Sequence, residues 1–306
     1  DIHGHLPALN AALDDAKNRG ISEFIFAGDY CLSGPFPDEC IAALMSLDHT
    51  YIVRGNEEKY LENLIGKDRR DWTDGQMQVT YWCFRNVKQE HLQFLTALPH
   101  TLEFMVNGVK VHLSHYSSTW IGDCEFRLIG PDVLAIRYER MNVTPEYYRQ
   151  DVHNLFSNDP DFQNALSVLE EGVYLFGHSH VQWNWQDTDR HIFLINPGSC
   201  GLPLDFIQDS VPYTVLSIAD DGTVSIEEIR VPFDKQGYAE VLRHSEQYTE
   251  ATVWTKVITK EWLKTCEHMK FFLEFTEQYA RKIGDIRRPF SVETWEKAYE
   301  IWNSGL

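Results

Sequence analysis

The sequence predicts an α/β fold in which strands and helices alternate around a mostly parallel sheet. The first observation is that short apolar runs end in polar loops, which lead into segments whose apolar residues recur every three or four positions. This order of strand, loop and helix is the βαβ rhythm of parallel sheets. The second observation is that hydrophobic residues make up 43% of the 306 residues. That fraction is enough for a sizeable core in one large domain or two.

The chain begins with a polar loop and a helix. Leucine and alanine recur at helical spacing over residues 6–17, which predicts an amphipathic helix. The preceding segment, from Asp1 to His5, is the kind of polar loop that follows a strand. We therefore expect an apolar strand before Asp1 in the full-length protein.

Further strands and helices follow in the same alternation. An Asn-Gly pair and an Asp-Gly pair each lie between two adjacent apolar runs, which predicts two β-hairpins. The expected strands lie at residues 23–27, 51–53, 102–106, 109–113, 173–176, 191–195, 213–218 and 224–230, and the expected helices at 37–47, 89–98 and 145–156.

Two regions stand outside this alternation. Residues 117–165 are irregular, polar and aromatic, and form an insertion that is either a lid or substrate wall, or a structural excursion. From residue 231 the pattern turns helical, so we expect a main domain at 1–230 and a helical extension at 231–306. The extension packs either on the main domain or on a second copy of the chain, which would give a homo-oligomer.

The chain is strongly acidic, with 27 Lys and Arg against 46 Asp and Glu and a net charge of −19. Such a surface repels nucleic-acid polymers and anionic membranes, so both are disfavoured as partners. No apolar run reaches the ~18–20 residues that span a bilayer. The six cysteines are scattered without a CxxC pair, which is typical of reduced thiols, and we expect a cytoplasmic protein.

Side chains that can bind metals recur at the ends of the predicted strands. In open α/β sheets, functional groups gather where the carboxyl ends of the strands meet. Carboxylate, amide and imidazole donors suit Mn, Fe, Zn, Co or Ni better than Ca. Each motif alone is common for structural reasons, but five at successive strand ends predict a metal site. In chain order they are Asp1-x-His3, Gly28-Asp29, Gly55-Asn56, His115 and His178-x-His180.

These five blocks resemble the signature of the calcineurin-like metallophosphoesterases. The closer likeness is to the compact bacterial and archaeal branch, which carries DIHG, here at residues 1–4, and INPGS, here at 195–199. The likeness covers about residues 1–230 and leaves the C-terminal helices unmatched. It implies a four-layer αββα sandwich of two mixed sheets, with two divalent metal ions, such as manganese, at the rim where the sheets meet.

The resemblance also implies which residues hold the two ions. Asp29 would bridge them, because a shared carboxylate can hold two cations at about 3.5–4 Å. A hydroxide bridging the metals would be the nucleophile, so no side-chain nucleophile is required. The implied ligand sets are Asp1, His3 and His180 for one ion, and Asn56, His115 and His178 for the other.

The sequence departs from the family pattern at two places. Glu57 follows Asn56 where many family phosphatases have the histidine that protonates the leaving group. The proton must then come from Glu57, from His5 or from water, although His5 is equally placed to cap the following helix. Tyr116 stands where the family usually has glycine, and it would narrow the site, stack on a substrate or only pack locally. Arg54 would reach a phosphate oxygen or form a surface ion pair.

The function predicted from these residues is a metal-dependent phosphoesterase, either a phosphodiesterase or a phosphatase, that acts on nucleotides or small phosphorylated molecules. One alternative is a protein phosphatase, which the compact-branch motifs disfavour. Another is a scaffold that uses this fold for protein docking without catalysis. Such scaffolds tend to lose a ligand imidazole, whereas all seven ligand positions are filled here.

Overall fold

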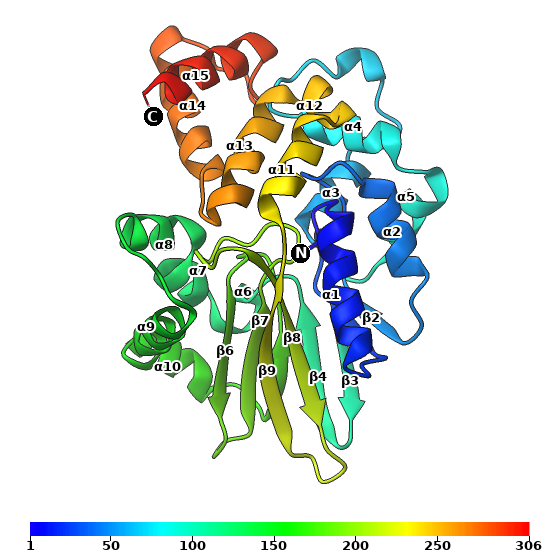
Figure 1. Ribbon diagram of the computed structural model, residues 1–306, viewed down its shortest axis with the longest axis vertical. Coiled ribbons are helices and arrows are strands. Elements are labelled where there is room, and N and C mark those ends of the chain that lie inside the picture. Colours follow the sequence, from blue (N-terminus) through cyan, green and yellow to red (C-terminus); the bar gives the residue numbers. More distant parts are fainter. Residues whose placement is uncertain (306) are drawn as a thin grey trace.

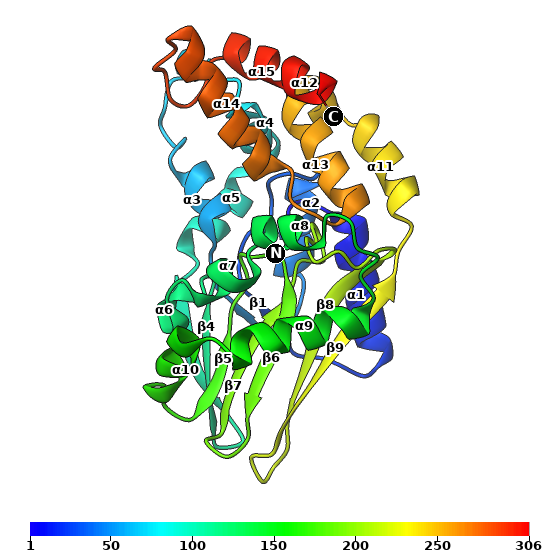
Figure 2. The ribbon, with the colours of Figure 1, turned by 90° about the vertical axis from the view of Figure 1, so that its left-hand side faces the viewer.

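Two layers of β-strands face each other across a shared apolar core, and helices cover both outer faces (Figures 1 and 2). The computed structural model describes residues 1–305. This arrangement confirms the predicted α/β fold with four layers.

The larger sheet has five strands in the order β3-β4-β5-β7-β6, with the bounds β3 Thr101–Val106, β4 Val109–Ser114, β5 Gly172–Leu175, β6 Gln182–Asp187 and β7 Ile192–Pro197. The central strands β4, β5 and β7 are parallel to one another, whereas the edge strands β3 and β6 run antiparallel to their neighbours. All of β5 and most of β7 are buried, as expected for apolar strands that are covered on both faces.

The second layer consists of two strand pairs that are not hydrogen-bonded to each other. β1 (Phe24–Phe26) pairs in parallel with β2 (Thr50–Ile52), and β8 (Ser210–Ile218) pairs antiparallel with β9 (Val224–Pro232). Apolar side chains from both pairs pack onto the inner face of β4, β5 and β7. A cavity of about 410 Å³ is lined by residues of β1, β8 and this inner face.

Helices of the N-terminal part cover the second layer. One apolar cluster joins these helices to the side chains of β1 and β2. Proline occupies the first turn of both α1 and α2, where its missing N–H group costs no hydrogen bond. The bounds are α1 Leu6–Asn18, α2 Pro37–Met45, α3 Asn56–Glu62, the short 3₁₀ helix Arg69–Asp71, α4 Gln78–Asn86 and α5 Gln89–Ala97.

The insertion is helical and covers the outer face of the larger sheet. Its side chains form one apolar cluster with Tyr174 and Trp183 of that sheet and with Phe176, which follows β5. The sequence predicted only the helix at 145–156, which is α9, because the neighbouring helices are too short for a clear periodicity. The bounds are α6 Ser118–Ile121, α7 Cys124–Ile129, α8 Pro131–Tyr138, α9 Pro145–Ser157 and α10 Pro160–Ser167.

The C-terminal extension consists of five helices with a core around Trp262, Phe272 and Trp295. It packs on the main domain of its own chain, where Nε2 of Gln247 donates to the carbonyl oxygen of Ser33 at 2.8 Å. Within residues 1–305, no helix has the length and apolar character to cross a membrane. The bounds are α11 Lys235–Arg243, α12 Glu246–Glu250, α13 Thr252–Lys264, α14 Met269–Ile283 and α15 Val292–Ser304.

Candidate metal centre

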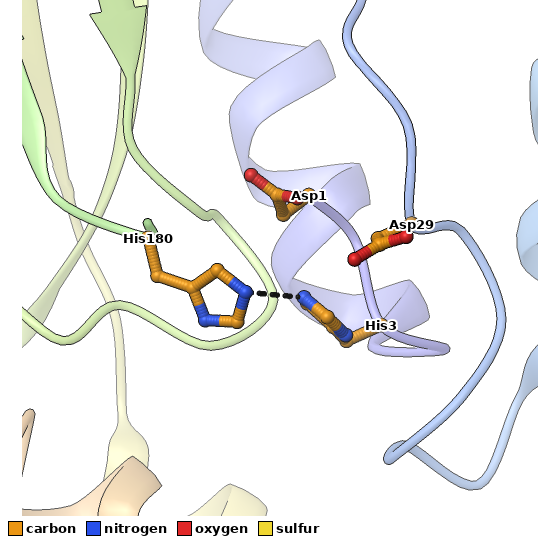
Figure 3. A group of neighbouring side chains, drawn as sticks. All are labelled: Asp1, His3, Asp29 and His180. Carbon is orange, nitrogen blue, oxygen red and sulfur yellow. Dashed lines mark hydrogen bonds between the residues drawn. The ribbon is translucent and has the colours of Figure 1, made fainter. Parts of the chain in front are cut away.

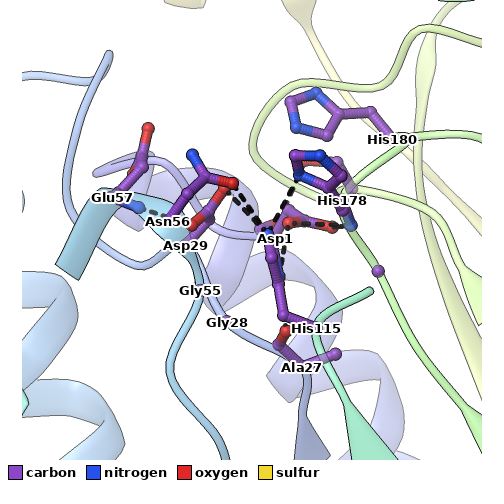
Figure 4. A network of polar contacts seen from close by, with 12 residues as sticks. Asp1, Ala27, Gly28, Asp29, Gly55, Asn56, Glu57, His115, His178 and His180 are labelled. Carbon is purple, nitrogen blue, oxygen red and sulfur yellow. Dashed lines mark hydrogen bonds and ion pairs between the residues drawn. The ribbon is translucent and has the colours of Figure 1, made fainter. Parts of the chain in front are cut away.

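Five loops meet at one edge of the two sheets and bring the polar motifs together (Figure 4). The backbone itself joins two of them, because the amide of Ile2 donates to the carbonyl oxygen of Asp29 at 2.8 Å. The loops carry Asp1 and His3 before α1, Asp29 after β1, Asn56 at the start of α3, His115 after β4, and His178 and His180 after β5.

These side chains form two groups of donor atoms that share one carboxylate. Within each group the candidate ligand atoms lie within 4.8 Å of one another. Oδ1 of Asn56 lies 3.1 Å from Nε2 of His115, which adds an amide oxygen to the second group. All seven sequence-predicted ligand residues are therefore together. The first group contains Asp1, His3, Asp29 and His180 (Figure 3), and the second contains Asp29, His115 and His178.

Hydrogen bonds from behind fix the orientation of two imidazole rings. Nδ1 of His115 donates to the carbonyl oxygen of Ala27 at 2.7 Å, and Nδ1 of His3 donates to Oε1 of Glu57 at 2.8 Å. Both bonds place the ring proton on Nδ1 and leave the lone pair on Nε2, which points into the centre. A carboxylate or carbonyl group in this position is the usual support of a metal-binding histidine.

Pairs of imidazole nitrogens face each other across the centre. Nε2 of His3 lies 2.9 Å from Nε2 of His180, and Nε2 of His115 lies 3.1 Å from Nδ1 of His178. Burial lowers the pKa of His3 to about 3 and that of His178 to about 4, so both rings are neutral near pH 7. Converging neutral imidazoles beside carboxylates fit divalent first-row metal ions.

Asp29 carries a negative charge in the middle of the centre. Burial is the largest single influence on its pKa and would raise it, but the charge and hydrogen bond of His115, at 3.3 Å between Nε2 and Oδ2, together with the charge of His3 and the amide of Glu57, lower it overall. Burial is also the largest influence on the pKa of His115 and would lower it, but the charge and hydrogen bond of Asp29, together with the carbonyl of Ala27 and the charge of Glu58, raise it overall. Asp29 is therefore ionised, as a carboxylate shared by two groups of metal-binding atoms needs to be.

The backbone is strained where it presents these donors. Four of the seven residues adopt positive φ angles, at 54° for His3, 56° for Asp29, 71° for His178 and 60° for His180. Such conformations cost of the order of 1–3 kcal/mol each and cluster at functional sites. Gly55 permits a close approach, because a Cβ atom there would lie 2.2 Å from Oδ1 of Asp29.

Glu57, a sequence-predicted candidate acid, lies behind the centre rather than facing its opening. It is 5% exposed, and besides its bond to His3 it accepts a hydrogen bond from the amide of Leu32 at 2.8 Å through Oε2. Burial, and then the charges of Asp29 and Glu58, raise its pKa. This geometry is that of a group that orients His3.

Glu58 is a supporting residue that the sequence analysis missed. Its Oε2 accepts from the backbone amides of Asp29 at 3.2 Å and Gly55 at 2.7 Å, and thereby ties two ligand-bearing loops together. A glutamate at the third position of a helix commonly bonds back to the residue before the helix. That capping pattern is the signal that could have found it.

The other three sequence-predicted site residues lie in different surroundings. His5 is fully buried, with ring centroids 5.0 Å from Tyr238 and 4.9 Å from Trp262. It precedes α1, yet its side chain makes no capping hydrogen bond.

Arg54 is 6% exposed, and its Nη2 donates to Oε2 of Glu62 at 2.7 Å. Arg54 is thus the buried member of this ion pair. Tyr116 is 38% exposed and lies at the opening of the centre, with its ring 4.8 Å from that of His115.

Glu125 of the insertion also supports the centre, and no sequence pattern indicates this role. This buried carboxylate accepts from Oγ of Ser179 at 2.7 Å, from Nε1 of Trp183 at 2.7 Å and from Nδ2 of Asn196 at 2.8 Å. Ser179 lies between the two ligand histidines His178 and His180. Helix α7 therefore anchors the loop that carries His178 and His180. Asn196 of the INPGS motif belongs to the same hydrogen-bond network.

Two facing sheets with carboxylate, amide and imidazole donors at their common edge define a four-layer α/β protein with a candidate two-metal centre. A comparison with models of protein families identifies its family. The model of the calcineurin-like phosphoesterase superfamily domain matches residues 1–221, so the chain belongs to this superfamily. The membership inferred from the motifs is confirmed.

Individual proteins are also similar to this chain. The chain is 30% identical over 247 residues to the uncharacterized protein MJ0912 of Methanocaldococcus jannaschii, covering 80% of this chain and 90% of that protein. Among solved structures, a metallophosphoesterase from Sphaerobacter thermophilus aligns with a TM-score of 0.54 at 18% identity, over 87% of this chain and 97% of that one. The hypothetical protein PH1004 from Pyrococcus horikoshii aligns with a TM-score of 0.52 at 15% identity, over 88% and 97%. These two structures support the fold.

Proposed function

We propose that this protein is a metal-dependent phosphoesterase that hydrolyses phosphate esters of nucleotides or small molecules. The observation that carries the proposal is the pair of donor groups that share Asp29. A carboxylate shared in this way suits two cations. The donor chemistry makes manganese, iron, zinc, cobalt and nickel the candidate metals.

The residues of the chain would hold the ions and orient the substrate. When bound, the ions would polarise the phosphoryl group and activate water for attack. No side-chain nucleophile is needed, and the nearby hydroxyl groups are already engaged. Oγ of Ser114 is 3.0 Å from Oγ1 of Thr119, and Oγ of Ser179 donates to Glu125.

The leaving group would take its proton from Glu57, His5 or water. Glu57 already binds His3 and Leu32, and His5 is sealed from solvent, so their positions favour water. We therefore expect esters with acidic leaving groups, such as aryl esters and phosphoanhydrides, to react faster than alkyl monoesters.

The test combines metal content with hydrolysis on the same preparation. Protein loaded with Mn, Zn or Co should bind two ions per chain and hydrolyse at least one of a matched pair of aryl phosphate mono- and diesters. Asp29→Asn should remove nearly all activity and lower the metal stoichiometry, because one neutral amide cannot hold both cations. The exposed Asp14→Asn is the matched control and should change neither.

The outcomes separate the candidate functions. An Asp29→Asn variant with full activity would contradict the proposed metal centre. Two bound ions without hydrolysis of any ester would instead favour the docking scaffold, and activity confined to phosphoproteins would favour the protein phosphatase.

A further inference from the structure

Three half-exposed aromatic side chains border the metal centre. Tyr60 is 44% exposed, and Tyr116 and Phe126 are each 38% exposed. They come from α3, from the loop after β4 and from α7 of the insertion. The donor side chains beside them are largely buried, so these rings, here called the aromatic rim, form the part of the site that meets solvent.

Two rings of the aromatic rim pack against one ligand histidine. The centroid of Tyr116 lies 4.7 Å from that of His178 at an interplanar angle of 75°, and the centroid of Phe126 lies 5.2 Å away at 53°. Tyr116 also contacts His115 at 4.8 Å. A ligand held at the donor groups would therefore lie close to both side chains.

Tyr60 of helix α3 completes the aromatic rim. It lies one helical turn after the ligand Asn56, so both side chains share one face of α3. Burial and then the charge of Asp29 raise the pKa of Tyr60, and the same two causes lead for Tyr116. Both hydroxyl groups thus lie in the field of the same carboxylate.

We propose that Tyr60, Tyr116 and Phe126 bind a planar aromatic group of the phosphoester, a nucleobase or an aryl ring, beside the metal centre. The inference rests on the proposed function, since the phosphate of the same ligand would be held at the donor groups. Ring faces that are open to solvent stack on planar groups with little dependence on sequence or substituent. The rim therefore favours esters that carry an aromatic group over esters that carry none.

The test measures binding without turnover. Phenylphosphonate and methylphosphonate both carry the phosphoryl group but no ester to hydrolyse, and differ in the ring. Calorimetric titration of the manganese-loaded protein should give tighter binding of phenylphosphonate, by roughly 5- to 150-fold for one stacked ring. Tyr116→Leu, Phe126→Leu and Tyr60→Leu should each reduce this preference, while the affinity for methylphosphonate stays constant.

A matched control lies elsewhere on the insertion. Tyr147 of α9 is 43% exposed, so Tyr147→Leu removes an equally exposed ring and should leave the preference unchanged. A third probe, a nucleoside phosphonate, separates the two sources of the ring. Binding tighter than that of phenylphosphonate identifies a nucleobase, and equal or weaker binding identifies a simple aryl group.

The remaining outcomes overturn the inference. Equal affinity for the phenyl and methyl probes in the unmodified protein does so, and so does a preference that survives all three substitutions. A substitution that weakens both probes equally indicates a role in packing the ligand loop. If no phosphonate binds, both the inference and the proposed function are overturned. If the protein prefers the phenyl probe through the rim but hydrolyses no ester, only the proposed function is overturned.

Discussion

Glu57 links the metal centre to the protein interior, because it bonds to the ligand His3 and to a backbone amide while it is almost sealed from solvent. Glu57 follows the candidate ligand Asn56 in the sequence. The sequence alone does not show that the first turn of α3 directs the Glu57 carboxylate behind His3. The direction of a side chain depends on the helix and its packing, which neighbours along the chain do not reveal.

We expect Glu57→Gln to weaken metal binding by roughly 10- to 100-fold, because the neutral amide supports the proton on His3 less well. The dependence of rate on leaving-group acidity should stay as steep as in the unmodified protein. Metal titration and rates on aryl and alkyl phosphate series check both points. A specific loss of about 10²–10⁴-fold on alkyl esters alone would instead identify Glu57 as the general acid.

Glu125→Ala should both destabilise the protein and weaken metal binding. It leaves Oγ of Ser179 and Nε1 of Trp183 without the acceptor that they use, which costs at least about 1–3 kcal/mol, whereas Nδ2 of Asn196 keeps the carbonyl oxygen of Gly177. It also frees the loop that carries His178 and His180. Denaturant unfolding and metal titration measure the two effects.

Two comparison variants sharpen this test. Glu125→Gln keeps one carbonyl acceptor and should have a smaller effect than alanine. Glu90→Ala, at a side chain that is 72% exposed, should change neither stability nor metal binding. A stable Glu125→Ala variant with unchanged metal affinity would refute the supporting role of Glu125.

At this scale, residue type and position at strand ends were sufficient to predict the seven candidate ligands. Glu58 and Glu125 could not be predicted in the same way. Both glutamates lie on helices, and Glu125 is 54 residues away from its hydrogen-bond partner Ser179 in the sequence. Acidic residues on helices are usually solvated, so their type carries little information about burial.

At the scale of elements, the short connections decide how closely the donors approach. β2 passes into α3 through Gly55, where the backbone lies against the Asp29 side chain. The connection leaves no room for a larger residue.

Gly55→Ala should therefore displace Asp29 and lower the affinity for metal by at least about tenfold, because both donor groups depend on that carboxylate. Gly305→Ala is the control, since a Cβ there meets nothing closer than 3.7 Å. Metal titration of the two variants provides the measurement, and equal affinities would contradict the close contact.

Among the strands of residues 1–305, β6 is the one that the sequence analysis missed. Its first four residues are Gln182-Trp183-Asn184-Trp185, in which polar and aromatic side chains alternate. This pattern belongs to an edge strand with one buried face, whereas the prediction relied on continuous apolar runs. The central strands β5 and β7 are such runs, and they were predicted.

At the scale of the whole molecule, the buried histidines should lower the stability of the metal-free protein as the pH falls from about 6.5 to about 4. Burial lowers the pKa of His3 to about 3, that of His178 to about 4, and that of His180 as well. As the pH drops below 6.5, the unfolded chain takes up protons on these histidines and the folded chain does not, so protons favour unfolding. The raised pKa values of His115, Glu57 and Glu58 act in the opposite direction, because the folded chain takes up protons on these groups before the unfolded chain does.

Urea unfolding midpoints measured with a chelator across this range check the prediction. His178→Asn should lose less stability than the unmodified protein between about pH 6.5 and pH 4, because it removes one of the groups that titrates differently in the two states. The same change of midpoint with and without His178 would contradict the neutral, buried state of this histidine.

The α/β class and the gathering of the motifs at one edge followed from the alternation of strands and helices. The sequence could not reveal how the extension packs, because apolar helix faces can be buried equally well in the same chain or in another. The structure decides this through contacts such as that between Gln247 and Ser33.

The wide separation of the donors along the chain has a consequence for the order of events during synthesis. The first donor group joins Asp1 and His3 to His180. At about 5–20 residues per second, a ribosome needs on the order of 10–40 seconds to translate that stretch. An emerging chain therefore carries several exposed imidazoles and carboxylates before the group can close, and selective loading of the proposed centre with metal would be a late step that follows folding.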